Sequence, residues 1–261
     1  MEENELSNKN DVKKQFSRSA DDYVKSQIHR KGTDLKRLLE MADITGNEIV
    51  LDVATGGGHT ANAFAALVKN VTAMDLTPEM LTASKKFIHN NGHSNVVFVE
   101  GDAEKMPFSD EQFDIITCRI APHHFPNIEK FISEVYRVLK SGGQFLLDDN
   151  VAPEEELFDH FYNKIEKIRD YSHYRAWKKT EWIQKIELEG FEIHELSRFE
   201  KRFEFMNWCE RMHLSEKVKE DLIDIILNAP EKVKCKFRIN IEDNQVRSFL
   251  GEAMLLKAIK R

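Results

Sequence analysis

The chain has 261 residues and a formal net charge of −7, with 32% charged and 41% hydrophobic residues. This length fits one large domain or a domain with a cap, and the negative charge argues against a broad basic face for nucleic acid. No run of 18 apolar residues occurs, so we expect no membrane span. The polar N-terminus does not resemble a signal peptide, and three scattered cysteines without metal-ligand spacing predict a cytoplasmic protein and no metal site.

The first segments of the chain are polar or helical. Residues 1–12 are polar and terminal, so we expect them to be disordered. A helix is predicted over residues 12–27, with Phe16 and Tyr23 on one face, and a second helix over residues 31–42. We expect residues 1–45 to form a helical lid that covers a face of a sheet or closes over a ligand.

The most informative stretch is 49–61, with the sequence IVLDVATGGGHTA. A short apolar run predicts a buried parallel strand, three glycines follow Asp52, and a helix begins near Ala61. Strand, glycine turn and helix form the opening unit of a nucleotide-binding sheet, in which glycine admits the ligand and the helix N-terminus favours an anion. Gly56, Gly58 and Ala61 also match the dinucleotide fingerprint.

A second short strand, 71–74, ends at Asp75. An acidic residue about 20 residues after the glycines is where the ribose hydroxyls of a nucleotide are bound. The other role open to Asp75 is to cap the next helix. Thr77 is a better cap, with Pro78 at the first helical position, so we expect Asp75 to be free for a ligand.

Three more strands are predicted before residue 150, at 96–99, 113–118 and 144–147, with helices at 78–90 and 128–139. Asp102 follows the third strand, where a carboxylate can accept from an exocyclic amine or bond its own turn. The polar and aromatic loop 119–127 follows the fourth. Five strands alternating with helices predict an α/β, doubly wound, Rossmann-like sheet.

Beyond residue 150 the pattern changes. Helices are predicted at 154–170 and 180–188, a sixth strand at 191–199, a mostly helical segment at 203–228, and strand-like runs at 237–243 and 246–260. We expect a single domain, 1–261, with a cofactor-binding half at 46–150 and a substrate-side half at 151–261 that holds a helical insertion near 200–235. The sheet should have about seven strands, mostly parallel with an antiparallel last strand, helices on both faces and a helical cap.

The ordered motifs carry a family resemblance. VLDVATGGGHT, Met74-Asp75, GDAEKMPF, FDIITCRIAPHHF and the stretch from EVYRVLKSGG to FLLDD resemble class I S-adenosylmethionine-dependent methyltransferases. The subgroup is similar to the ubiquinone/menaquinone C-methyltransferases and their small-molecule relatives. The resemblance runs from about residue 12 to residue 150.

This resemblance implies roles for individual residues. The glycine loop would wrap the methionine moiety above Asp52, Asp75 would bind the ribose, and Asp102 with Ala103 would bind the adenine. The N-terminal segment FSRSADDY would cover the cofactor. The implied cofactor-binding residues are Tyr23, Asp52, Ala54, Thr55, Gly56, Gly58, Asp75, Leu76, Asp102, Ala103, Arg119 and His124.

Two positions depart from the family pattern. Ala54 replaces the first glycine of the loop, so we expect a backbone there that is not left-handed. Ser141 replaces a frequent proline before Gly142 and Gly143. Neither departure removes a ligand side chain.

The expected reaction is methyl transfer from S-adenosylmethionine to a small, partly apolar molecule. In-line positioning does most of the work, and a base is needed only if the acceptor holds its proton. The candidate catalytic residues are His123 and Asp148, with His124 also considered as a base; both histidines could instead cap the loop or pack on Phe125. The negative net charge argues against a nucleic-acid acceptor. Oligomeric state cannot be inferred from the sequence.

Two other functions fit parts of the pattern. A nicotinamide-dependent oxidoreductase would share the glycine turn and the acid, and Tyr136 with Lys140 matches the catalytic pair of short-chain dehydrogenases. That pair lies on a helix whose apolar face is expected in the core, so packing explains Tyr136 better. A non-catalytic protein that binds S-adenosylmethionine would carry the same motifs.

Overall fold

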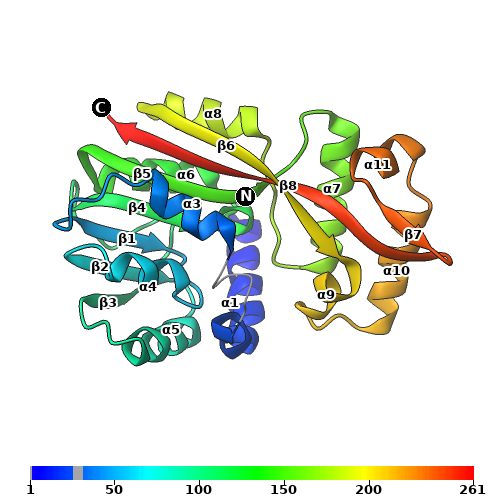
Figure 1. Cartoon of the computed structure of the whole chain (residues 1–261), viewed down its shortest axis with the longest axis horizontal. Coiled ribbons are helices and arrows are strands. Elements are labelled where there is room, and N and C mark those ends of the chain that lie inside the picture. Colours follow the sequence, from blue (N-terminus) through cyan, green and yellow to red (C-terminus); the bar gives the residue numbers. More distant parts are fainter. Residues whose placement is uncertain (1, 26–31) are drawn as a thin grey trace.

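The computed structural model describes residues 2–25 and 32–261 and, within the first range, the side chains of residues 5–17. Its centre is an 8-stranded sheet in the order β3-β2-β1-β4-β5-β8-β6, with β7 paired to β8 (Figure 1). The strands are β1 (Ile49–Val53), β2 (Asn70–Asp75), β3 (Val96–Glu100), β4 (Phe113–Arg119), β5 (Leu139–Val151), β6 (Phe191–Glu204), β7 (Asn240–Glu242) and β8 (Gln245–Lys260).

The sheet is parallel from β3 to β5, and β8 is antiparallel to both β5 and β6. This confirms the predicted doubly wound α/β class with an antiparallel last strand. The helical elements are α1 (Glu2–Lys25), α3 (Thr33–Met41), α4 (His59–Ala65), α5 (Pro78–Asn90), η1 (Pro122–His124), α6 (Ile128–Val138), α7 (Glu156–Arg169), α8 (Lys179–Leu188), α9 (Phe205–Glu210), α10 (Glu216–Leu227) and α11 (Glu231–Lys236).

Alternating side chains of the strands enter two separate cores. Leu51 and Val53 face the cluster that α6 and α8 cover, whereas Val50 faces the cluster that α3, α4 and α5 cover. In β5, Leu147 faces the first of these clusters and Leu146 faces the second. This period of two explains why the helices lie on both faces of the sheet.

The chain beyond residue 150 builds its own layer on a long pair of strands. β6 and β8 extend past the edge of the central sheet and carry α9, α10 and α11 next to α7 (Figure 1). Trp208, Leu222 and Phe249 lie in one core there, and Tyr162 and Phe237 lie in another. Most aromatic side chains of the insertion therefore stabilise this layer.

One prediction about the N-terminus is wrong. Residues 2–12 belong to α1, which begins at Glu2, although the sequence predicted disorder over residues 1–12. Asn8 donates to the carbonyl of Ser172, and the Lys9 ammonium pairs with Asp102 and Glu104. These partners are far away in the sequence, so no local pattern could indicate them. Residues 26, 27 and 31 of the predicted helices lie outside the described residues.

Candidate functional site

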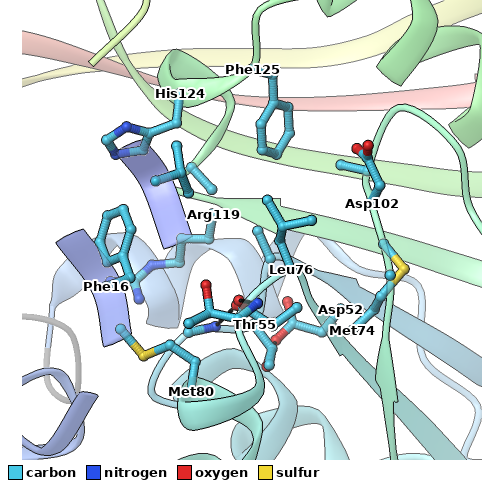
Figure 2. Close-up of a pocket in the computed structure, with 18 of the residues that line it drawn as sticks. Phe16, Asp52, Thr55, Met74, Leu76, Met80, Asp102, Arg119, His124 and Phe125 are labelled. Atoms are coloured by element: carbon cyan, nitrogen blue, oxygen red, sulfur yellow. Dashed lines mark hydrogen bonds between the residues drawn. The ribbon is translucent and has the colours of Figure 1, made fainter. Parts of the chain in front are cut away.

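A pocket lies where β1, β2, β3 and β4 end, at the point where the strand order reverses between β1 and β4. Such crevices at the carboxyl ends of strands are where open α/β sheets bind ligands. The pocket holds about 1020 Å³ of space, including the solvent at its mouth. Figure 2 shows side chains from α1, the strand ends and the loop after β4 gathered around it.

Most of the residues predicted to bind a cofactor come together in this wall. They are Asp52, Ala54, Thr55, Gly56, Asp75, Leu76, Asp102, Ala103, Arg119 and His124. The side chain of Tyr23 lies outside the described residues. Gly58, His123 and Asp148 do not line the pocket. The sequence did not single out Lys9, Val12 or Met80, which also line it.

Asp52 organises the glycine loop from below. Its buried carboxylate accepts from the hydroxyls of Thr55 (2.6 Å) and Thr117 (2.8 Å) and from the backbone N–H of Ala61 (3.1 Å). Burial raises the pKa of Asp52 to about 6, against the opposing effect of these hydrogen bonds. The side chain thus ties the end of β1 to the start of α4 and to β4, which fixes the shape of the loop.

The loop backbone differs from the expectation at Ala54. Its φ is 53°, which is left-handed, so the predicted ordinary conformation is wrong. The turn forces this conformation although alanine carries a Cβ that disfavours it. The next residue, Thr55, donates its N–H to the carbonyl of Met74 at 2.9 Å, which holds the turn against β2.

Gly58 has a structural reason for being glycine. Its φ is 79° at the N-terminus of α4, and an added Cβ would lie 2.8 Å from Cβ of Ser84 and 3.0 Å from Ile88. Gly58 therefore lets α4 pack closely on α5 and supports the pocket from behind. Gly56 lines the pocket, and a Cβ there would meet nothing nearer than 4.0 Å.

Asp75 joins the glycine loop to the end of β2. Oδ2 accepts from the N–H of Gly56 at 2.8 Å, and Oδ1 accepts from the N–H of Thr77 at 2.9 Å. Asp75 therefore has structural partners and is not wholly free for a ligand, whereas Thr77 occupies the N-cap position of α5 with Pro78 after it, as predicted. Each carboxylate oxygen has a second lone pair, so the residue, which is 8% exposed, still has acceptor capacity toward the pocket.

Asp102 has the turn role, one of the two that the sequence left open, and it also pairs with a lysine of α1. Oδ1 accepts from the N–H of Glu104 at 2.9 Å, which is a turn of the aspartate's own backbone. Oδ2 faces the ammonium of Lys9 from α1 at 2.7 Å. Lys9 also pairs with Glu104 at 2.5 Å. This ion-paired cluster fastens α1 over the β3 end of the pocket.

Arg119 ends β4 between two acids. Its guanidinium lies 2.6 Å from Asp34 of α3 and 3.3 Å from Asp148 of β5. Asp148 is fully buried behind it, and burial raises the pKa of Asp148 to about 7 although the positive charges of Lys201 and Arg119 oppose this. Asp148 therefore supports Arg119 from behind and is not part of the pocket wall.

The raised pKa of Asp148 predicts a pH-dependent stability. Because its pKa is higher in the folded chain than the ordinary 3.8, the folded state binds the extra proton between about pH 4 and 7. The contribution of Asp148 to the free energy of unfolding therefore falls as pH rises through that window, by at most about 1.4 kcal/mol per pH unit. Asp148→Asn should gain stability relative to the wild type from pH 4 to 7 in urea unfolding, whereas the exposed control Asp224→Asn should not. Parallel curves for Asp148→Asn and the wild type would refute this.

The two neighbouring histidines of η1 have different environments. Nδ1 of His123 lies 2.6 Å from Oδ1 of Asp149. Burial opposes the charged form of His123, but the Asp149 carboxylate outweighs it and raises the pKa of the imidazole. His124 lines the pocket and contacts the edge of Phe16, with ring centroids 5.1 Å apart.

In residues 2–25 and 32–261, no group of three histidine, cysteine, aspartate or glutamate side chains could hold a metal ion. No helix within the same ranges has the length and apolar character needed to cross a membrane.

Comparisons with known proteins agree with the geometry. A family model described as a methyltransferase domain matches residues 51–147. The uncharacterized methyltransferase YcgJ of Bacillus subtilis is 34% identical over 247 residues, which cover 94% of this chain and 98% of YcgJ. The ubiquinone/menaquinone biosynthesis C-methyltransferase UbiE of Rickettsia prowazekii is 34% identical over 160 residues, covering 56% of this chain and 63% of UbiE.

Solved structures share the fold. A candidate methyltransferase from Bacillus halodurans is 56% identical with a TM-score of 0.86, covering 88% of this chain and 99% of that one. A phosphoethanolamine N-methyltransferase of Haemonchus contortus, in complex with S-adenosyl-L-methionine, is 18% identical with a TM-score of 0.57 over 88% of this chain and 52% of that one, which shows a common fold. The chain therefore belongs to the methyltransferase family, as its ordered motifs predicted.

Proposed function

We propose that this chain binds S-adenosylmethionine in the pocket and transfers its methyl group to a small, partly apolar molecule. The observation that carries the proposal is the convergence of the glycine loop, Asp75 and Asp102 on one pocket at the reversal of strand order. A fold neighbour from Haemonchus contortus holds S-adenosyl-L-methionine, which supports the same cofactor here.

The donor set fits each part of that cofactor. The carboxylate of Asp75 suits two ribose hydroxyls, and Asp102 suits the exocyclic amine of adenine once Lys9 shares or leaves its oxygen. Leu76 and Ala103 offer apolar contact to the flat ring. Thr55 and Gly56 line the wall above Asp52, where the methionine moiety would lie. When bound, S-adenosylmethionine supplies a methyl group on a positively charged sulfur.

The walls of the pocket support a small acceptor. α1 covers the pocket with Val12 and Phe16, and the loop after β4 adds Ile120 and Phe125. Apolar walls with few polar groups suit a small molecule and exclude water from a reactive sulfonium. The lining residues end at Pro126, so the second half of the chain would influence specificity by supporting the wall from behind.

The oxidoreductase alternative is disfavoured by the position of Tyr136. Its ring packs edge-on against Phe191, with centroids 5.1 Å apart, and the ammonium of Lys260 lies 4.6 Å from its centroid. Tyr136 lines a shallow depression with Arg137 and Glu189 and does not line the main pocket. The helix expected to carry both residues ends at Val138, and Lys140 lies in β5 with its ammonium 2.7 Å from Asp114. Tyr136 therefore has a packing role, and Lys140 belongs to an ion pair.

The cofactor assignment makes a direct prediction. The purified protein should bind S-adenosylhomocysteine and S-adenosylmethionine in calorimetry and give no measurable response to NADH. The reason is that the site joins a buried acid under the loop, Asp52, to a second acid at the end of β3, Asp102. Tight binding of NADH without any response to S-adenosylhomocysteine would refute the assignment.

The acceptor requires a separate test. A metabolite library incubated with the protein and S-adenosylmethionine should yield S-adenosylhomocysteine with at least one small acceptor, and RNA, DNA and protein pools serve as the other arms. Release only with a macromolecular pool would contradict the small-molecule proposal. Cofactor binding without release in any arm would favour a non-catalytic binding protein.

A further inference from the structure

His124 lines the pocket, and one of its two ring nitrogens already has hydrogen-bond partners. The residue is 7% exposed and lines the pocket (Figure 2). Nδ1 lies 3.1 Å from the carbonyl oxygen of Ser172 and 3.2 Å from its Oγ. Within residues 2–25 and 32–261, both hydrogen-bond partners of the ring lie at Nδ1. Nε2 takes no part in the contacts with Ser172, and the imidazole ring packs edge-to-face with Phe16 of α1.

The partners of Ser172 determine which nitrogen carries the proton. The hydroxyl of Ser172 donates to Oδ1 of Asp170 at 2.6 Å, and the backbone N–H of Ser172 donates to the same oxygen at 2.9 Å. Since the only hydroxyl hydrogen is directed to Asp170, Oγ can only accept from His124, as the carbonyl must. Nδ1 of His124 is consequently the donor, and Nε2 carries a lone pair.

Burial and the neighbouring ring of His123 favour the neutral form of this imidazole. Burial lowers the pKa of His124, the neighbouring ring of His123 lowers it further, and the charges of Asp170 and Asp149 oppose both. The ring centroids of His123 and His124 are 4.3 Å apart, and the carboxylate of Asp149 favours the protonated form of His123 by raising its pKa. His173 adds to the same buried group and has its own pKa lowered by burial and by His123. The environment thus favours the neutral form of His124 and the protonated form of His123 beside Asp149.

We propose that His124 is the catalytic base of this site, and that Nε2 takes the proton of an acceptor hydroxyl of the phenol or enol class. The inference rests on the proposed methyl transfer and deepens it. Nε2 is on a residue of the pocket wall and is unprotonated, whereas Nδ1 of His123 bonds Asp149 outside the wall. Ser172 acts as a positioning residue, because it sets the tautomer from behind.

The proton and electron balance explains the class of acceptor. The acceptor oxygen bonds to the methyl carbon while the carbon–sulfur bond breaks and its electron pair stays on sulfur, which becomes a neutral thioether. The O–H bond breaks, its pair stays on oxygen, and the proton goes to Nε2 of His124. A weak base suits this step, since a hydroxyl proton becomes strongly acidic as its oxygen gains a methyl group. An amine would keep a proton that such a base could not remove.

The experiment is nitrogen-15 NMR of the full chain labelled at histidine, with and without S-adenosylhomocysteine, and with phenol as the probe. His124 should be the neutral Nδ1–H tautomer at pH 7, and millimolar phenol added to the complex should shift its Nε2 resonance. His123 in the same sample is the internal control and should not respond. His124→Asn keeps a donor for Ser172 but has no Nε2, so phenol affinity should fall about tenfold. Ser172→Ala should lower the fraction of the Nδ1–H tautomer.

Two results would overturn the assignment. One is a protonated His124 or an Nε2–H tautomer at pH 7, and the other is an Nε2 resonance that phenol leaves unmoved while calorimetry shows S-adenosylhomocysteine bound. If S-adenosylhomocysteine does not bind at all, the proposed function fails and the proton transfer fails with it. The tautomer, the phenol response and the cofactor titration thus separate the two failures.

Discussion

Asp75→Ala is expected to weaken S-adenosylhomocysteine binding by about tenfold to a hundredfold. Hydrogen bonds from hydroxyls to a charged group contribute about 1.5–3 kcal/mol, and about 1.4 kcal/mol is one decade in affinity. The substitution also removes the acceptor of the Gly56 N–H, so the loop that would hold the methionine moiety loses its tie to β2. Calorimetric titration of the wild type and the variant measures the difference.

The structure changes what this variant should do to the free protein. The sequence analysis expected Asp75 to be free for a ligand, which would leave the stability of the free protein little changed in this variant. Since its oxygens accept from Gly56 and Thr77, we now expect a loss of about 1–3 kcal/mol in the free energy of unfolding. Asp75→Asn keeps one acceptor oxygen and should fall between the wild type and alanine in both measurements.

Asp102→Ala is the matched comparison at the other end of the pocket. It removes one contact to an amine while the apolar contact with the ring remains, so its affinity loss should be smaller. The variant also leaves Lys9 with Glu104 as its remaining partner in the cluster. An unchanged affinity in Asp75→Ala, or a larger loss in Asp102→Ala, would contradict the ribose assignment.

The part of the fold set by local patterns was predictable. Short apolar runs bounded by polar turns mark β1 to β4. Asp243 and Asn244, two residue types that favour tight hairpin turns, join β7 to β8 with positive φ angles. The lengths of β5 and β6 were underestimated, whereas β8 was predicted to within one residue. The extra residues at the end of β5 and of β6 are strand because they pair with β8, which is far away in the sequence.

The site was predictable where the chain is close to itself in sequence. The glycine loop, Asp75 and Asp102 follow successive strands, so parallel topology alone places them at one edge. Lys9 could not be predicted, because its partners lie beyond residue 100. The different positions of His123 and His124 could not be predicted either. A single 3-10 turn directs His123 toward Asp149 and His124 toward the pocket. At Ala54 the preference of the residue type gave the wrong prediction, because the turn imposes a left-handed backbone conformation that alanine disfavours.

Removing α1 should separate ligand binding from folding. Deletion of residues 1–25 is expected to weaken S-adenosylhomocysteine binding at least about tenfold and to abolish turnover. Lys9, Val12 and Phe16 line the pocket from this helix, and α1 supplies the cation that faces Asp102. Without the helix, the pocket opens to water and loses one apolar wall, which a reactive sulfonium cannot tolerate.

The same deletion should leave a cooperative thermal transition. None of the described side chains of α1 belongs to the buried hydrophobic clusters on either face of the sheet or in the layer beyond residue 150. α1 lies beside the strand ends (Figure 1) and is tied to the rest by polar contacts such as Ser17 with Glu79 at 3.0 Å. Phe16→Ala should reproduce part of the affinity loss, whereas Leu6→Ala, at a residue that is 63% exposed, should bind normally. Normal binding after the deletion would refute the lid, and loss of the cooperative transition would show that α1 belongs to the folding core.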